Sequence, residues 1–141
     1  VPAGQTRDYI FGYTILNDVS ARDVQTAHKQ WYFGKSLDGF TPIGPCIVTA
    51  DAFADYPPRL GIRSFVNGEK RQDSNTALQI FDIDHVVAEL SQGMTLKAGT
   101  IIATGTPAGV GMGMDPPQFL KPGDVVRCEI DGIGTLTNPV K

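Results

Sequence analysis

Cysteine and histidine are scarce in this sequence, with two of each in 141 residues. Cys46 and Cys128 lie far apart, and neither belongs to a CxxC or His–Cys pattern of the kind that binds zinc. Both occur in apolar or strand-like surroundings, so we predict that they are buried free thiols. With no signal peptide visible, this composition favours a reducing cytoplasm as the setting of the protein.

Long apolar runs and clusters of basic residues are also absent. No segment approaches the roughly 20 apolar residues of a membrane-spanning helix, so we predict no membrane association. The 12 Lys and Arg residues are scattered, and the net charge is −3. Nucleic acid is therefore not an expected partner, because its recognition requires a basic surface.

The remaining composition is that of a globular domain. Hydrophobic residues make up 41% of the chain and charged residues 19%, which is the usual balance for such domains. A domain of about 150 residues buries roughly 68–70% of its unfolded surface. No repeat or linker divides the sequence, so we predict one domain spanning residues 1–141.

Polar functional groups gather where the first apolar run ends. Residues Ile10–Leu16 are rich in aromatic and β-branched side chains and predict a strand, and Asp18 follows its end. Ser20 and Asp23 have the spacing of a capping box, so a helix should begin near Ala21.

The predicted helix carries Arg22, Gln25 and Lys29 at three- and four-residue spacing, which should place them on one polar face. A carboxylate beside such a face suits a hard divalent cation and an anionic, oxygen-rich ligand. A single Asp after a strand is, however, more often a turn or cap residue, and one carboxylate does not make a metal site. The residues alone leave both interpretations of Asp18 open.

Two later segments have features of a binding site. Lys35 is a lone cation after an aromatic cluster, where burial would let its ammonium stabilise a developing oxyanion; the alternative is an ordinary solvated lysine. The Gly-rich loop 105–113 follows a predicted strand, Ile101–Thr104. Its backbone N–H groups could bind an anion, or it could be a tight connection; it lacks the Gly-Lys-Ser/Thr of a P-loop.

The other segments predict scaffold elements. Asn67-Gly68 predicts a two-residue hairpin turn before a polar edge strand, and Asp131-Gly132 predicts a second one. Apolar spacing from Ile83 to Leu90 predicts an amphipathic helix, with Asp82 or Asp84 as its cap and Gly93 at its end. His28 and His85 have no ligand partner at usable spacing, and we interpret them as ordinary histidines. These elements define a β-rich α+β fold.

Several blocks, in order, resemble the C-terminal catalytic region of the fumarylacetoacetate hydrolase family. They are NDVSARDVQ (17–25), WYFGKSLDGFTPIGP (31–45), QDSNT (72–76), SQGMTLKAGTIIATGTPAGVG (91–111) and LKPGDVVRCEIDGIGTLTNPV (120–140). The resemblance implies a mixed β-roll with short peripheral helices, a homodimer, and divalent-metal chemistry on small diketo or β-keto acids through a metal-stabilised enolate. The reactions in question are C–C bond hydrolysis, decarboxylation and tautomerisation.

The resemblance also implies roles for particular residues. Asp18 would bind Mg²⁺ or Mn²⁺, with Ca²⁺ as a further candidate, and Lys35 would be catalytic, stabilising the oxyanion in contact with substrate. Arg22 and Gln25 would orient substrate or support the metal site, Thr106 would hold a substrate oxygen, and residues 72–76 would border the site. The family's two metal-binding glutamates and its lid acid and base precede this region, so we expect the chain to correspond to the last half to two thirds of an enzyme.

One departure and several alternatives remain. Leu37-Asp38-Gly39-Phe40 replaces a hydroxyl residue that some members carry after the lysine, so no second cation is expected there. The sequence of this loop resembles that of the family's bacterial-type branch and does not specify which of the reactions is catalysed. Alternatives are dehydration of a 2-keto-3-deoxy sugar acid, a noncatalytic dimerising or ligand-binding fragment, and general anion binding by the Gly-rich loop.

Overall fold

The computed structural model of the chain describes residues 1–27 and 29–141. Within these residues the chain forms six strands, two α-helices and five short 3-10 helices, which confirms the β-rich α+β class. The strands are β1 (Gly12–Leu16), β2 (Ile43–Thr49), β3 (Gly61–Val66), β4 (Glu69–Asn75), β5 (Val125–Ile130) and β6 (Gly134–Pro139). The helices are α1 (Arg22–Ala27), α2 (Ile83–Gly93), η1 (Thr6–Tyr9), η2 (Phe33–Lys35), η3 (Ala50–Ala52), η4 (Thr76–Leu78) and η5 (Gly111–Gly113).

The larger sheet has four antiparallel strands in the order β4-β3-β5-β6. The predicted Asn67-Gly68 turn joins β3 to β4, with φ of 52° and 85° at its two residues. Positive φ at both positions is the geometry of a tight hairpin turn whose twist matches that of the strands. The polar strand β4 lies at the sheet edge, as its composition predicted.

The smaller sheet consists of β1 and β2, paired antiparallel from Gly12↔Thr49 to Leu16↔Ile43. It meets the larger sheet where β2 approaches β6. A Cβ at Gly134 would lie 3.2 Å from Pro45 Cγ, so the glycine permits this close approach. The buried apolar side chains among the described residues are Ile15, Val87, Val126 and Ile133, contributed by both sheets, the β5–β6 turn and α2.

Helix α2 begins at the cap residue Asp82, whose carboxylate accepts a hydrogen bond from the His85 N–H at 2.8 Å. The other predicted cap, Asp84, binds the N-terminal segment instead. Its carboxylate accepts from the Gly4 N–H at 2.7 Å and from the Thr6 hydroxyl at 2.6 Å. Thr6 is fully buried, so these bonds hold η1 against α2.

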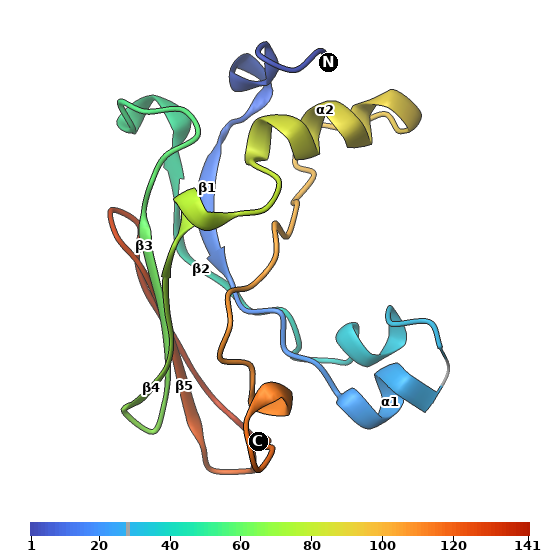
Figure 1. Cartoon of the computed structure of the whole chain (residues 1–141), viewed down its shortest axis with the longest axis vertical. Helices are drawn as coiled ribbons and strands as arrows, with labels where there is room; N and C mark the ends of the chain where they lie inside the picture. The colour runs from blue at the N-terminus through green and yellow to red at the C-terminus, as the bar shows by residue number, and fades with distance from the viewer. Residues whose placement is uncertain (28) are drawn as a thin grey trace.

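Two helical segments project from the same side of the sheets, at opposite ends of the molecule (Figure 1). One is α2; the other, which we call the α1–η2 lobe, comprises residues 20–27 and 29–42 around α1 and η2. The chain after α2 descends between them and reaches η5 near the lobe (Figure 1). Among the described residues, no helix combines the length and apolar character needed to cross a membrane.

Four predictions about local structure were wrong. Ile101–Thr104 forms no strand among the described residues, because no neighbouring strand pairs with it. The turn at Asp131 has three residues rather than two, since Ile130 pairs with Gly134. Cys46 is exposed because β2 belongs to a two-stranded sheet that leaves most of its residues exposed, and Cys128 is half-buried; both thiols are free, as predicted. Lys29 lies beyond the end of α1 at Ala27, with φ of 56°, so it leaves the predicted polar face.

Of the two histidines, His85 lies among the described residues. The His85 ring stacks on the Phe81 ring, with centroids 4.8 Å apart and planes inclined by 18°. This packing agrees with the interpretation of His85 as an ordinary histidine. His28 lies outside the described residues.

Candidate functional site

An ion pair joins the two residues that the sequence singled out for metal binding and catalysis. Asp18 follows β1, Lys35 ends η2, and the Lys35 ammonium contacts Asp18 Oδ2. The same ammonium donates a hydrogen bond to Ser20 Oγ at 3.1 Å. An ammonium has three hydrogens, so one remains for a ligand. The side chains of Lys35 and Asp18 are 27% and 43% exposed, which leaves the pair accessible.

Gly34 brings Lys35 to Asp18. The Gly34 carbonyl accepts a hydrogen bond from the Ala21 N–H at 2.8 Å, so η2 lies directly on the start of α1. A Cβ at Gly34 would lie 2.7 Å from Gln25 N and 2.8 Å from the Ala21 carbonyl oxygen. Only glycine fits this contact, and the next residue in the chain is the lysine of the ion pair.

Ser20 has a different role from the one predicted. Its hydroxyl donates to the Asp18 carbonyl oxygen at 3.2 Å and accepts from Lys35. The capping-box prediction was wrong, because the nearby ammonium engages the hydroxyl. Ser20 is thus a site residue that the cap pattern concealed; its position two residues after Asp18 was the available signal.

Arg22 and Gln25 form a second pair on α1. Arg22 Nη1 donates to Gln25 Oε1 at 3.0 Å. Gln25 is 3% exposed. Its buried amide oxygen therefore holds the guanidinium of Arg22, which is less buried. The structure places Arg22 on the accessible side of this pair, and the contribution of Gln25 is to fix its direction.

Thr106 belongs to a separate cluster on the larger sheet. It is exposed in the Gly-rich loop, and its Oγ1 accepts a hydrogen bond from Gln72 Nε2 at 2.9 Å. Gln72 begins the QDSNT block, while Thr76 at its end is a structural residue: its hydroxyl donates to the Pro58 carbonyl and accepts from the Leu60 N–H. Ser64, which donates to Gln72 at 2.8 Å, was not predicted as a member of this cluster. Its polar side chain between the apolar strand positions Ile62 and Val66 was the feature of the sequence that could have indicated it.

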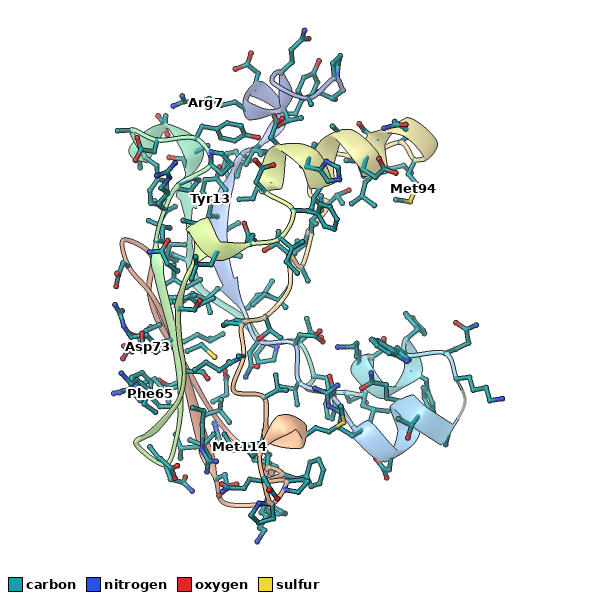
Figure 2. The ribbon with its side chains drawn as sticks, in the orientation of Figure 1. Arg7, Tyr13, Phe65, Asp73, Met94 and Met114 are labelled. Carbon is teal, nitrogen blue, oxygen red and sulfur yellow. The ribbon has the colours of Figure 1, made fainter. Side chains whose placement is uncertain are left out.

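The two clusters face the same side of the molecule. In Figure 1 the α1–η2 lobe and the loop leading to η5 both lie on the side of the sheets toward which α2 projects. Figure 2 shows Phe65 and Asp73 on the opposite side of β3 and β4. The site side therefore carries an ammonium, a guanidinium, a carboxylate and hydroxyl groups, which suits an acidic, oxygen-rich small molecule.

Asp18 can act as a single ligand of a divalent cation. Its Oδ2 contacts Lys35, and no hydrogen bond within residues 1–27 and 29–141 uses Oδ1. In the same residues, no group of three His, Cys, Asp or Glu side chains is arranged to hold a metal ion. Mg²⁺ is commonly held by one or two carboxylates together with water and substrate oxygens, so Asp18 fits one position of such a site and does not complete it.

The fold and site together define a β-rich domain that carries paired acidic and basic groups on one side. The family model described as fumarylacetoacetate (FAA) hydrolase C-terminal matches residues 1–141. The chain belongs to the fumarylacetoacetate hydrolase family.

Relatives of this chain include characterised and structurally determined proteins. Oxaloacetate tautomerase YisK of Bacillus subtilis is 51% identical over 133 residues, which are 94% of this chain and 44% of that protein. The fumarylacetoacetate hydrolase structure from Exiguobacterium antarcticum is 52% identical with a TM-score of 0.96, covering 100% of this chain and 50% of that one. The 5-carboxymethyl-2-hydroxymuconate delta-isomerase structure from Mycobacterium smegmatis is 47% identical with a TM-score of 0.86, covering 99% and 51%. The chain spans about half the length of these relatives.

Proposed function

We propose that this chain is the catalytic region of a divalent-metal-dependent enzyme that acts on small keto acids through an enolate, and that its reaction is keto–enol tautomerisation of oxaloacetate. The observation that carries the proposal is the Asp18–Lys35 ion pair at the end of β1, in a chain 51% identical to an oxaloacetate tautomerase. In this proposal, residues 1–141 form a single catalytic domain.

Each site residue has a chemical task in this proposal. Tautomerisation moves a proton from C3 of oxaloacetate to the oxygen on C2, and negative charge develops on that oxygen as the C–H bond breaks. Lys35 donates its third hydrogen to the developing oxyanion. Arg22, held by Gln25, binds a carboxylate of the substrate, and Thr106 holds another substrate oxygen.

Asp18 holds the cation, Mg²⁺ or Mn²⁺ with Ca²⁺ as a further candidate. When bound, such a cation supplies Lewis-acid polarisation of the keto group and orients the acid. The Asp18 carboxylate also fixes the Lys35 ammonium beside the same ligand. The acid and base that exchange the proton are expected from segments of the family fold that precede this region.

A second reaction has specific support. The chain is 47% identical to the M. smegmatis 5-carboxymethyl-2-hydroxymuconate delta-isomerase. A 2-hydroxymuconate carries its enol oxygen next to a carboxylate, as enol-oxaloacetate does, so the same donors would serve both acids. Decarboxylation and C–C bond hydrolysis start from the same enolate and are further outcomes of the test below.

A homodimer is also part of the proposal. Large apolar side chains are well exposed in this chain, including Trp31 at 63% and Ile47 at 57%. Monomeric proteins rarely leave extensive apolar surface uncovered. Burial of these groups against further protein is therefore consistent with an assembled enzyme.

The test is ultraviolet-monitored equilibration of oxaloacetate by the protein at its natural length, with Mg²⁺ or Mn²⁺ and with chelator, after subtraction of metal-only decay. A tautomerase speeds the approach to the keto–enol equilibrium and leaves total oxaloacetate unchanged. A decarboxylase depletes the total and releases CO₂, and acetylpyruvate added in parallel reports hydrolysis.

The remaining outcomes point to the alternatives. Metal binding without turnover of these acids would direct the search to 2-keto-3-deoxy sugar acids. The absence of both metal binding and turnover would favour a noncatalytic dimerising or ligand-binding role. Acid binding that a chelator leaves unchanged would favour anion binding by the Gly-rich loop.

A further inference from the structure

Gln72 connects the larger sheet to the Gly-rich loop through its side-chain amide. It lies on β4 opposite Ser64 of β3, and its Oε1 accepts from the Ser64 hydroxyl at 2.8 Å. Its Nε2 donates to Thr106 Oγ1 at 2.9 Å and to the Pro107 carbonyl oxygen at 2.8 Å. Ser64 is 9% exposed, so the chain of bonds runs from the sheet interior to an exposed hydroxyl.

The chemistry of the partners fixes the direction of these bonds. The Pro107 carbonyl can only accept, so the NH₂ end of the amide must face the loop. The amide oxygen then faces Ser64, whose hydroxyl must donate. One amide hydrogen goes to Pro107 and the other to Thr106, so the Thr106 oxygen is an acceptor here. The hydrogen of the Thr106 hydroxyl is therefore left to donate to another group.

A β-bulge places the loop against β4 at this position. The β3–β4 register shifts between Ser64 and Phe65, which leaves Arg71 as the extra residue on β4. A bulge can redirect a side chain, and Arg71 Nη1 contacts Met114 Sδ at 3.0 Å beyond the loop. A Cβ at Gly109 would lie 2.1 Å from the Arg71 carbonyl oxygen, so the loop backbone lies directly on the strand.

We infer that Gln72 is a positioning residue that orients the Thr106 hydroxyl so that it donates to a carboxylate or enolate oxygen of the ligand. This inference rests on the proposed function, which supplies an acidic ligand. Thr106 in this state is a hydrogen-bond donor whose hydrogen points away from the Gln72 amide. A ligand that presents an acceptor oxygen at this position is favoured over one that presents a hydroxyl donor.

The test combines substitutions of the two partners in the Gln72–Thr106 hydrogen bond. The measured quantity is the binding of oxalate, a non-reacting enolate-like dianion, determined by calorimetry on the natural-length protein with Mg²⁺. Gln72→Met keeps the length of the side chain and removes the amide; we expect oxalate binding to weaken about 3- to 10-fold, the range of one hydrogen bond. Gln72→Glu should weaken it more, because the carboxylate accepts the Thr106 hydrogen and repels the anion. Gln92→Met, on the exposed face of α2, is the matched control and should bind oxalate as wild type does.

The decisive comparison is Gln72→Met in a Thr106→Val background. If Gln72 acts through Thr106, the second substitution adds little to the first. Equal weakening in both backgrounds would overturn the inference, as would oxalate binding by Gln72→Met at wild-type strength. Failure of the wild-type protein to bind oxalate would also overturn it, and the parallel turnover assay would show whether the proposed function fails with it.

Discussion

Replacing Gly34 with alanine tests whether the close contact between η2 and α1 positions Lys35, the residue to which we assign the catalytic role. The added Cβ would lie 2.7 Å from Gln25 N, 2.8 Å from the Ala21 oxygen and 2.9 Å from Gln25 Cα, whereas ordinary contact begins at 3.4 Å. All three are backbone atoms of the α1 region, which cannot rotate away. The segment carrying Lys35 must therefore retreat from α1 by about 0.7 Å.

This displacement has two consequences of different size. Overpacking of this kind costs about 1–3 kcal/mol of the free energy of unfolding, which corresponds to a Tm about 2–12 °C lower for a protein of 150–250 residues. Catalysis is more sensitive, because a misplacement of 1 Å can cost about 100-fold in rate. Lys35 follows Gly34 directly, so we expect turnover to fall roughly 10- to 100-fold.

Thermal unfolding and oxaloacetate equilibration, both measured on Gly34→Ala, are the assays. Gly93→Ala is the matched control, since a Cβ at Gly93 meets nothing within 4 Å and alanine there should stabilise the helix by up to about 1 kcal/mol. A Gly34→Ala protein with wild-type Tm would show that the η2–α1 contact is not tight. A lowered Tm with unchanged turnover would refute the link between this contact and the position of Lys35.

Three further substitutions test the site and the scaffold. Asp18→Asn should weaken Mn²⁺ binding in calorimetry at least about 10-fold by removing a charged ligand, while Asp115→Asn should not; equal binding by both would remove Asp18 from the metal site. Lys35→Met should lower turnover about 10²- to 10³-fold, as expected for one lost oxyanion donor. Lys97→Met is the control and should leave turnover unchanged. A wild-type rate in Lys35→Met would show that Lys35 has no part in catalysis. The Thr6 hydroxyl and the Gly4 N–H hold the pKa of Asp84 below its usual 3.8, so its carboxylate stabilises the fold above that pH, and this contribution is lost as the pH falls through the lowered pKa. Asp84→Asn should therefore lower Tm at pH 6 and have a shrinking effect below about pH 4, whereas a Tm difference independent of pH would contradict this role.

Local sequence chemistry determined several elements of this protein. Asn67-Gly68 specified a hairpin because few other residues adopt positive φ at two successive positions, and the structure has that turn. The apolar spacing of residues 83–90 specified α2 but left Asp82 and Asp84 as alternative caps, and the structure assigns the cap to Asp82, whose carboxylate satisfies a free backbone N–H. The ordered blocks from residue 17 to 140 identified the family, because they preserve residue types that no single secondary-structure pattern requires.

Other features could be decided only by the tertiary structure, because they depend on what lies nearby in space. Ser20 has the pattern of a cap, yet Lys35, fifteen positions away, takes its hydroxyl. Ile101–Thr104 has the composition of a strand, but a strand needs a neighbour to pair with, and sequence composition does not supply one. Residues 18 and 35 suggested separate roles, and their ion pair depends on a glycine whose missing side chain lets two segments meet.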